Sequence, residues 1–418
     1  MLSGAVVAML DQALLSAMNF CIGLAFISLA AKTDYGIYTQ LFGLLMLSQT
    51  LQGALANAPL VSLGPKRRRR ARQALAAHLF RLQTLISLLL ALVACSGVSI
   101  AVWWLEMPAL SHAIALPFAL AIAGQWIREF ARKYHFLTLN PHRTLAIDCL
   151  YAAVLGSLLL AMVLLERFNT VSVFWAMATA NLLAGGHGLI RTKLRPFALH
   201  GRAGQRLRDS WQLSKWTLPS VVVTWGSNYS FIYIVAAMIG AAAAAEISAA
   251  RLLVMPAALC INAWSNTFSP RFSQWVGEGD FNRLGKVMFW SAIGLTGITL
   301  AYGTALALVY DLLVTYVLGE GYADIGGMIV LWLLYIAIFA VRKIGVIAMV
   351  GGGHYKEMFG YSLANFICSL PILVLATWLL GTRGAVIGLI AVESINLALV
   401  WLRGWPDLKR RWQRTGGS

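Results

Sequence analysis

The feature that most constrains the fold is a regular series of apolar segments, each near the length of about 20 residues that crosses a bilayer as a helix. The segments are continuous apolar runs, whereas a barrel would alternate apolar and polar residues over about ten positions. Twelve spans are expected, over residues 5–31, 37–63, 79–104, 111–134, 145–165, 171–191, 215–240, 245–268, 286–310, 325–350, 358–380 and 384–403. We therefore predict an all-α integral membrane protein.

The composition agrees with a chain that lives mainly in lipid. Hydrophobic residues make up 59% of the 418 residues and charged residues only 12%, against roughly 45–50% and 25% in soluble domains. The net charge is +17, but Lys and Arg gather in every second break between spans. Loops rich in these residues stay in the cytoplasm, where they face an anionic leaflet. This alternation predicts cytoplasmic N- and C-termini, and it explains the charge without nucleic acid as a partner.

A weak internal repeat indicates two lobes of six helices. Aligning Asn19-Phe20 with Asn228-Tyr229 brings the break at residues 34–36 close to a second break at residues 245–246, and Pro59 close to Pro270. Such repeats are common in transporters, where substrate sites lie at the repeat interface. The expected domains are an N-terminal lobe (1–192), a cytoplasmic basic linker (193–213), a C-terminal lobe (214–404) and a cytoplasmic basic tail (405–418).

Several segments resemble a known family of membrane transporters. They are DQALLSAMNF (11–20), DYGIYTQL (34–41) and NAPLVSL (57–63), with SNYSFIYIV and AAEISAARLLVMPAALCINAWSNTFSPRF in the second half. The chain is similar here to the polysaccharide-transporter branch (Wzx-like flippases) of the multidrug/oligosaccharidyl-lipid/polysaccharide (MOP) exporter superfamily. The family pattern is a helix that ends at a Tyr-Gly break, followed by a helix that closes near a proline.

The resemblance implies a flippase of the bacterial inner membrane. Its cargo would be an undecaprenyl-pyrophosphate-linked oligosaccharide, carried from the cytoplasmic to the periplasmic leaflet for O-antigen or exopolysaccharide assembly. The partners it implies are membrane lipids, polysaccharide polymerase or other assembly proteins, and H⁺ or Na⁺ as a coupling ion. The expected mechanism is alternating access around a central cavity lined by cations.

The run LLYIAIFAVRKIGVIAMVGGG (333–353) places two adjacent cations, Arg342 and Lys343, inside an apolar span. A charge at the bilayer centre costs about 2.5 to more than 10 kcal/mol. Snorkelling to headgroups would reduce this cost, but nearly two further apolar turns follow on their cytoplasmic side. A pyrophosphate in a low-dielectric cavity would instead give both residues a partner. We expect both to bind substrate phosphate.

Three further arginines are candidates for the same role. Arg128 and Arg132 are four residues apart and share a helix face, and Arg251 lies near the start of its span. Each has a structural alternative. Arg128 can pair with Glu129 or Asp148, Arg251 can pair with Glu246, and Arg132, together with Lys133, can reach headgroups at the helix end.

Carboxylates within the spans are fewer. Glu393 is either a protonatable coupling site or the partner of an interior cation, and we favour the partner role. Asp148 and Asp11 are further candidates for coupling or charge pairing, although Asp11 also suits the positive start of a helix. The amides of Asn19 and Asn228 are candidates for glycan binding, although helix packing explains most single amides.

The sequence contains no pattern typical of an enzyme or a bound cofactor. GEGDFNRLGK (277–286) lacks the GxxxxGK[ST] spacing of a phosphate-binding loop, and no histidine shows HExxH or other metal-ligand spacing. The five cysteines occur singly in apolar runs, so neither zinc nor disulfides are expected. We predict no catalytic residue, metal or cofactor.

Two alternatives to the flippase stay open: a drug/cation antiporter of the same superfamily, which would need buried acid, and a membrane glycan ligase or polymerase, which would need a larger periplasmic loop.

Overall fold

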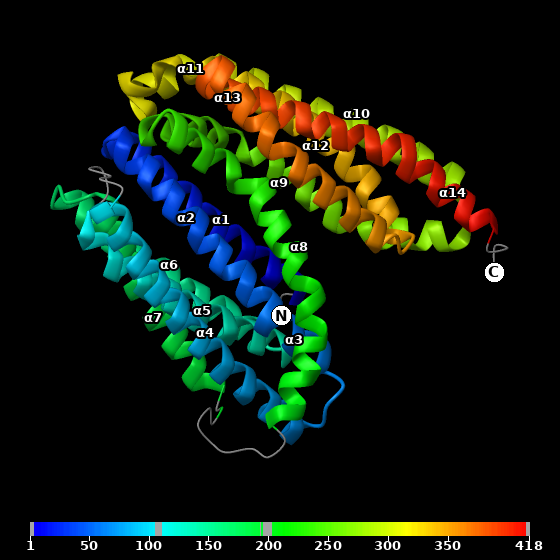
Figure 1. Ribbon diagram of the computed structural model, residues 1–418, viewed down its shortest axis with the longest axis horizontal. Coiled ribbons are helices and arrows are strands. Elements are labelled where there is room, and N and C mark those ends of the chain that lie inside the picture. The colour runs from blue at the N-terminus through cyan, green and yellow to red at the C-terminus, as the bar shows by residue number, and fades with distance from the viewer. Residues whose placement is uncertain (1–3, 105–110, 193, 195–202, 415–418) are drawn as a thin grey trace. The chain divides into compact units, whose positions relative to one another are not determined.

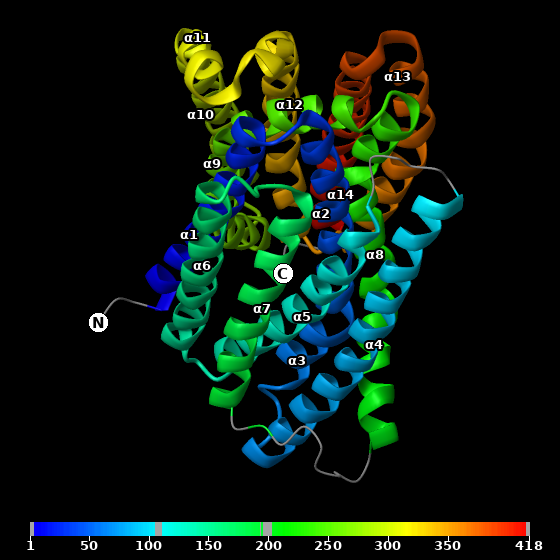
Figure 2. The same ribbon diagram turned by 90° about the vertical axis from the view of Figure 1, so that its left-hand side faces the viewer.

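The computed structural model describes residues 4–104, 111–192, 194 and 203–414. Within these residues every regular element is a helix, as the continuous apolar runs predict. The chain divides into two compact units, Met1–Trp225 and Gly226–Ser418, so the division falls inside one long helix. Figures 1 and 2 show the elements of both units.

The first unit contains eight α-helices and two short irregular helices. In chain order they are α1 (Gly4–Leu29), α2 (Lys32–Gln52), η1 (Gly53–Asn57), α3 (Ala58–Leu63), α4 (Arg69–Trp104), η2 (His112–Ile114), α5 (Ala115–Leu137), α6 (Pro141–Leu164), α7 (Thr170–Thr192) and the first part of α8 (Ala203–Met238). Segments α2, η1 and α3 together form the second expected span. The π-helix η1 leaves the Ala54 carbonyl available, and Ser214 of α8 donates a hydrogen bond to it at 2.9 Å.

Helix α5 is the centre of this unit, in contact with α4, α6 and α7 (Figure 2). Its aromatic side chains Trp126 and Phe130 are fully buried. Small residues let α5 and α7 approach closely, as is usual for helices that associate in membranes. A Cβ atom at Gly185 of α7 would lie only 2.8 Å from the backbone nitrogen of Arg128. Gly185 therefore allows the turn of α5 that carries Arg128 to pack against α7.

The second unit follows the end of α8. Its elements are α9 (Ala241–Glu278), α10 (Phe281–Leu308), α11 (Tyr310–Leu313), η3 (Val314–Leu318), η4 (Glu320–Ile325), α12 (Gly326–Gly351), α13 (Tyr355–Leu399), η5 (Val400–Gly404) and α14 (Trp405–Arg414). Helix α12 contacts α9, α10 and α13, and Figure 1 shows α10, α12 and α13 running alongside one another. Fully buried alanines, Ala244, Ala245, Ala249 and Ala250, line the side of α9 that packs inward.

All twelve expected spans correspond to helical segments. The two last spans are continuous in α13 but separated by a kink at Gly381, whose φ of 63° and ψ of −146° are not helical. Nine helices of the described residues are long and apolar enough to cross a membrane. That count takes α13 once and omits α2 and α5. Helix α5 is omitted because it carries Arg128, Glu129, Arg132 and Lys133 within its span.

Several expected boundaries move by a few residues. The expected break at residues 34–36 is wrong, because α2 already begins at Lys32 and Asp34 lies in its first turn, where a carboxylate is favoured by the helix dipole. The break in the second half moves likewise, to Gly240 with a φ of 125°. Of the expected linker, residues 193 and 195–202 lie outside the described residues, and the part from Ala203 is helical. The expected tail is helical to Arg414, and residues 415–418 lie outside the described part.

Candidate functional site

The first unit contains a buried cluster of five charged residues, which we call the first cluster. Helix α5 contributes Arg128, Glu129 and Arg132, α1 contributes Asp11, and α6 contributes Asp148. All five residues are at most 8% exposed. The one-turn spacing of Arg128 and Arg132 places both guanidiniums on the face of α5 that meets α1 and α6.

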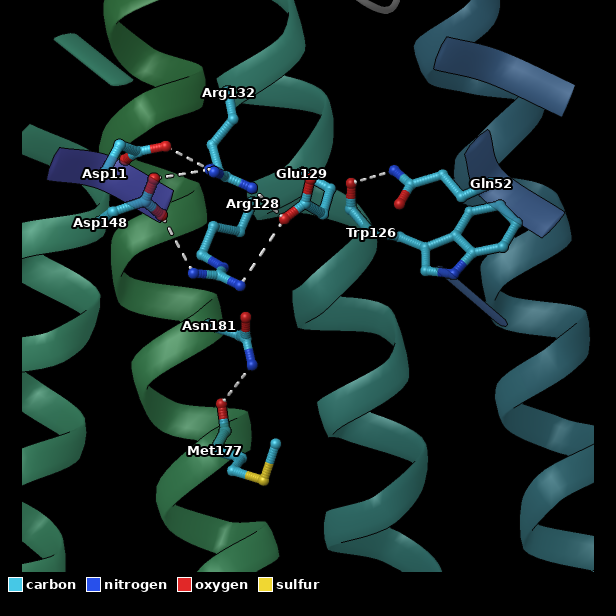
Figure 3. Close-up of polar contacts among 9 residues, drawn as sticks. All are labelled: Asp11, Gln52, Trp126, Arg128, Glu129, Arg132, Asp148, Met177 and Asn181. Atoms are coloured by element: carbon cyan, nitrogen blue, oxygen red, sulfur yellow. Dashed lines mark hydrogen bonds and ion pairs between the residues drawn. The ribbon is translucent and has the colours of Figure 1, made fainter. Parts of the chain in front are cut away.

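Arg132 is the hub of the first cluster (Figure 3). Its Nη2 donates to Asp11 at 2.8 Å, its Nε to Asp148 at 2.6 Å and its Nη1 to Glu129 at 2.5 Å. Each nitrogen of the guanidinium therefore has its own carboxylate partner. The expectation that Arg132 reaches the headgroups is wrong, because burial and three carboxylates hold the side chain inside the bundle.

Arg128 contacts the same carboxylates from one turn earlier. Its Nη1 donates to Asp148 at 3.1 Å, and its Nη2 lies 3.7 Å from Glu129. The guanidinium carbon lies 3.8 Å from the centre of the Tyr151 ring, within the range of a cation–π contact. Both pairings left open by the sequence are therefore present, while Nε of Arg128 is buried without a hydrogen-bond partner among the described residues.

The first cluster has more acid than base. Two guanidiniums contact three carboxylates, so the formal charge is −1 when all five groups are ionised. Ion pairing repays the cost of burying charges only where each charge has well-placed partners. The surplus carboxylate makes this cluster suited to taking up a proton or a small cation, rather than a phosphate.

A cavity of about 240 Å³ adjoins the first cluster. Arg128, Glu129 and Arg132 line it together with the amides Asn19, Gln49, Gln125 and Asn181. The side-chain oxygens of Gln125 and Asn181 are buried without hydrogen-bond partners among the described residues, as is Oδ1 of Asp11. Asn181 donates its NH₂ group to the Met177 carbonyl at 2.8 Å. Buried acceptor oxygens without partners are rare, and Gln125 and Asn181 place two of them in residues that line this cavity.

A network of amides ties α2 and α4 to α5 beside this cavity. Gln52 donates to the Trp126 carbonyl at 2.6 Å and to Gln83 at 2.8 Å. Gln83 also donates to the Trp126 carbonyl at 3.3 Å. These contacts are structural, since both amides are buried and bind the backbone of α5.

The second unit contains a different set of charges, Arg251, Arg342, Lys343 and Glu393, which we call the second cluster. Arg342 of α12 donates through Nε to Glu393 of α13 at 2.5 Å. The Arg342 side chain is 17% exposed and that of Glu393 6%. Glu393 is therefore the partner of an interior cation in this structure, while the guanidinium keeps an exposed edge.

Arg251 of α9 is held by aromatic rings. Its guanidinium carbon lies 5.4 Å from the Phe231 ring centre, 5.6 Å from that of Trp332 and 5.8 Å from that of Tyr229. Its Nη1 lies 3.3 Å from the Asn228 carbonyl oxygen, which accepts a hydrogen bond. Among the described residues, no carboxylate lies within salt-bridge distance of Arg251. The alternative in which Arg251 pairs with Glu246 is therefore wrong here.

An aromatic ladder on α12 joins the two arginines. Trp332, Tyr335 and Phe339 are spaced three and four residues apart, so they lie on one helix face. The Trp332 and Tyr335 ring centres are 5.3 Å apart, and those of Tyr335 and Phe339 are 6.4 Å apart and stacked. Arg342 follows three residues on, 5.3 Å from the Phe339 ring centre. The ladder places a cation at each end of a row of rings.

The second cluster has more base than acid. Three cations and one carboxylate give a formal charge of +2 when all are ionised. Lys343 adjoins Arg342 in sequence but points about 100° away around the helix, and it is half-buried. Among the described residues, Lys343 and Arg251 have no carboxylate partner. This arrangement suits an anionic ligand that also offers a flat face to aromatic rings.

A cavity of about 700 Å³ in the second unit has a different character. Its lining is apolar and includes Met288, Phe289, Trp401, Leu402 and Trp405, with no charged residue among the described ones. It lies between α10, α12, α13, η5 and α14. Such a cavity fits alkyl chains and not phosphates.

The predicted residues thus separate into two groups. The group in the first unit consists of Asp11, Asn19, Arg128, Arg132 and Asp148. The group in the second unit consists of Asn228, Arg251, Arg342 and Glu393, with Lys343 beside them. Sequence reasoning missed the ladder residues Trp332, Tyr335 and Phe339, although their helical spacing was readable. It also missed Tyr151, for which no sequence pattern exists. No group of three or more His, Cys, Asp or Glu side chains among the described residues is placed to hold a metal ion.

The fold is similar to that of solved membrane transporters, which confirms the all-α membrane fold expected from the sequence. No family model matches the chain, and no curated protein matches its sequence. Solved structures match over nearly the whole length. The lipid II flippase MurJ in an inward closed conformation aligns with a TM-score of 0.75 at 9% identity, covering 96% of this chain and 86% of that one.

Multidrug transporters share the same fold. An inward-facing multidrug resistance MATE family transporter of the MOP superfamily aligns with a TM-score of 0.73 at 14% identity, covering 96% of this chain and 95% of that one. A MATE transporter of Vibrio cholerae, VcmN, aligns with a TM-score of 0.60 at 15% identity over 99% and 98% of the two chains. Similarity at these identities shows a common fold and does not indicate the substrate. The substrate has to be inferred from the charges of the two clusters.

Proposed function

We propose that this chain is a flippase that carries an undecaprenyl-pyrophosphate-linked oligosaccharide from the cytoplasmic to the periplasmic leaflet of the bacterial inner membrane. The observation that carries the proposal is the cation excess of the second cluster next to a row of aromatic rings. Pyrophosphate needs fixed cations in a low-dielectric site, and sugar rings stack on aromatic faces. We place both termini in the cytoplasm, following the distribution of Lys and Arg.

Arg342 would bind the pyrophosphate by exchanging partners. Its Nε binds Glu393 at 2.5 Å, and an arriving phosphate would offer the guanidinium a second, bidentate partner. Arg251 would supply a second contact from the other end of the ladder, because its ring neighbours leave its charge uncompensated. Lys343 would add a third positive charge. Asn228 would act through its backbone carbonyl, which orients Arg251.

The first cluster would couple transport to an ion. Its surplus carboxylate among Asp11, Glu129 and Asp148 can take up H⁺ or Na⁺, which neutralises the cluster. Arg128 and Arg132 have their charges compensated here, so their role toward the substrate would be secondary. Asn19 lines the adjoining cavity and would contact the glycan. The proposal includes no enzymatic step, metal or cofactor, and it places the chain beside polymerase and other assembly proteins.

The test uses the full chain in proteoliposomes with a fluorescent, prenyl-pyrophosphate-linked oligosaccharide in one leaflet. Quenching by a membrane-impermeant reductant measures the rate of transfer. The variant R251Q/R342Q/K343Q should lose transfer. Each hydrogen bond to a charged group that is removed should weaken the affinity for the substrate roughly tenfold to a hundredfold.

The matched control is R167Q/K286Q/R383Q, which removes the same charges from exposed positions. It should transfer at the wild-type rate. Wild-type transfer by a correctly inserted R251Q/R342Q/K343Q variant would overturn the proposal.

A cation antiporter is the second candidate, and the net negative charge of the first cluster favours it. Such a protein would bind an organic cation at Asp11, Glu129 and Asp148. The same vesicles can be loaded with a fluorescent cation and exposed to a proton gradient. Gradient-driven cation transport that survives R251Q/R342Q/K343Q but fails in D148N would favour the antiporter over the flippase.

A further inference from the structure

A second basic site lies in the first unit, outside the first cluster. A cavity of about 260 Å³ between α5, α6 and α7 is lined by His135, His142, Arg143, His187 and Arg191, together with Ala146 and Ile147. None of these described lining residues is acidic. Neither the transport proposal nor the first cluster uses any of these side chains.

The two arginines of this cavity are linked through a backbone contact and have no counter-charge among the described residues. Nη1 of Arg143 donates to the backbone carbonyl of Arg191 at 3.4 Å, which brings the start of α6 to the end of α7. Neither arginine has a carboxylate within salt-bridge distance among the described residues. Two arginine side chains that line one cavity without a carboxylate create a positive potential there, which favours an anion.

The local backbone adds to the positive potential. Helix α6 begins at Pro141, its first turn has no acidic residue, and the side chain of Asn140 makes no capping hydrogen bond. The positive end of a helix dipole favours an anion, and cations such as His142 and Arg143 are unfavourable there. His142 and Arg143 therefore lie in the first turn of α6, where positive side chains are electrostatically unfavourable.

His135 adds a buried basic side chain to the lining of this cavity. It lines the cavity yet is only 1% exposed. Its Nε2 lies 3.2 Å from the Gly188 carbonyl, to which it donates, while its Nδ1 is buried without a hydrogen-bond partner among the described residues. Buried polar atoms are rarely left unpaired.

Apolar surface continues from this cavity along both helices. On α7, Leu183 and Ile190 are 54% and 78% exposed and share a face with His187. On α6, the exposed residues Ala146, Cys149 and Ala153 follow His142 at helical spacing and lie on one face. A phosphate in the cavity would thus be followed by a lipid-facing apolar surface.

We propose that this cavity binds the phosphate of an anionic membrane lipid, whose acyl chains lie against the exposed apolar residues of α6 and α7. The ligand chemistry is a phosphate ester carrying negative charge. Basic pockets between helices at a membrane surface bind such headgroups. The site is separate from the proposed transport site, so either proposal can fail without the other.

The test measures lipid retention by the purified full chain. Native mass spectrometry counts lipids bound from mixed micelles of phosphatidylglycerol and phosphatidylcholine. Wild type should prefer phosphatidylglycerol. R143Q/R191Q should reduce that preference roughly thirtyfold, as expected from removing two arginines near an anionic surface. The control R167Q/R383Q loses the same charge elsewhere and should keep the wild-type preference.

A variant that keeps both arginines covers the possibility that R143Q/R191Q does not fold. A146F fills the cavity without changing charge, and it should also lose the preference while eluting as a monodisperse protein. An unchanged preference in both variants would overturn the proposal, as would an equal loss in R167Q/R383Q. A final measurement adds inorganic phosphate as a competitor. If inorganic phosphate binds as tightly as phosphatidylglycerol and displaces the lipid, the site recognises free phosphate and the lipid assignment is wrong.

Discussion

The two charged clusters use buried arginines in opposite ways. In the first unit, Arg132 is surrounded by Asp11, Glu129 and Asp148, each of which binds a different nitrogen. In the second unit, Arg342 has one carboxylate partner, and Arg251 is held by rings and a carbonyl. A cation inside a span is therefore no sign by itself of an anionic ligand. What matters is whether the neighbouring helices already compensate it.

The difference in compensation also separates stability from function. A guanidinium with three buried carboxylates stabilises the helix bundle, because removing it leaves those charges uncompensated. A guanidinium among aromatic rings keeps its charge available for a ligand. The first cluster should therefore be sensitive in stability measurements, and the second in binding and transport measurements.

The largest effect should come from removing the hub of the first cluster. R132M leaves three buried carboxylates with Arg128 as their remaining partner, and we expect a loss of about 3–5 kcal/mol in the free energy of unfolding. Denaturant unfolding in detergent, followed by tryptophan fluorescence, measures it. R167Q, at an exposed position, is the control and should unfold like wild type. A loss below about 1 kcal/mol in R132M would show that the first cluster is not compensated as described.

A smaller effect is expected in the second cluster. E393Q removes the partner of Arg342, but the Arg342 side chain is 17% exposed, so we expect a loss of about 2 kcal/mol rather than the full penalty of a buried pair. A double-mutant cycle with R342Q isolates the pairwise energy. If Glu393 is only a charge partner, R342Q/E393Q should unfold at a higher denaturant concentration than R342Q, because the double variant no longer buries an uncompensated carboxylate. If E393Q alone abolishes ion-driven transfer without affecting stability, Glu393 is a coupling site instead.

The aromatic ladder should matter less for stability than for binding. Y335L removes the ring between Trp332 and Phe339, and aromatic pairs contribute about 0.5–1.5 kcal/mol beyond burial. We expect a stability loss of about 1 kcal/mol, together with weaker binding of the oligosaccharide and unchanged binding of a prenyl pyrophosphate that lacks sugar. Isothermal titration in detergent measures both ligands. Y316L, at a position 80% exposed, is the control. Equal weakening for both ligands would argue against sugar stacking.

The smallest effect sets a baseline for exposed ion pairs. Arg67 and Asp209 form a salt bridge at 2.9 Å in the first unit, with side chains 25% and 38% exposed. Exposed pairs contribute about 0–1 kcal/mol, so D209N should change the free energy of unfolding by less than about 1 kcal/mol, and less still in high salt. A loss as large as that of R132M would mean that burial does not account for the difference between pairs.

Much of the fold could be predicted because its determinants are local. Apolar length fixes the number of helical segments, and Gly381 marks the turn between the last two. Boundaries were less predictable, since Asp34 suits either a break or the first turn of a helix. Of the candidate site, the shared face of Arg128 and Arg132 followed from helical spacing. The partnership of Arg132 with Asp11, 121 residues apart in sequence, did not, because it depends on which helices pack together.

The sequence by itself determined that this chain is an all-α membrane protein with charges buried in its spans, since backbone hydrogen bonds in lipid must be satisfied within each helix. Only the tertiary structure decided which of those charges are compensated. The reason is that pairing depends on how each helix is rotated about its axis and on its neighbours. That packing gives the first cluster a surplus of acid and the second a surplus of base.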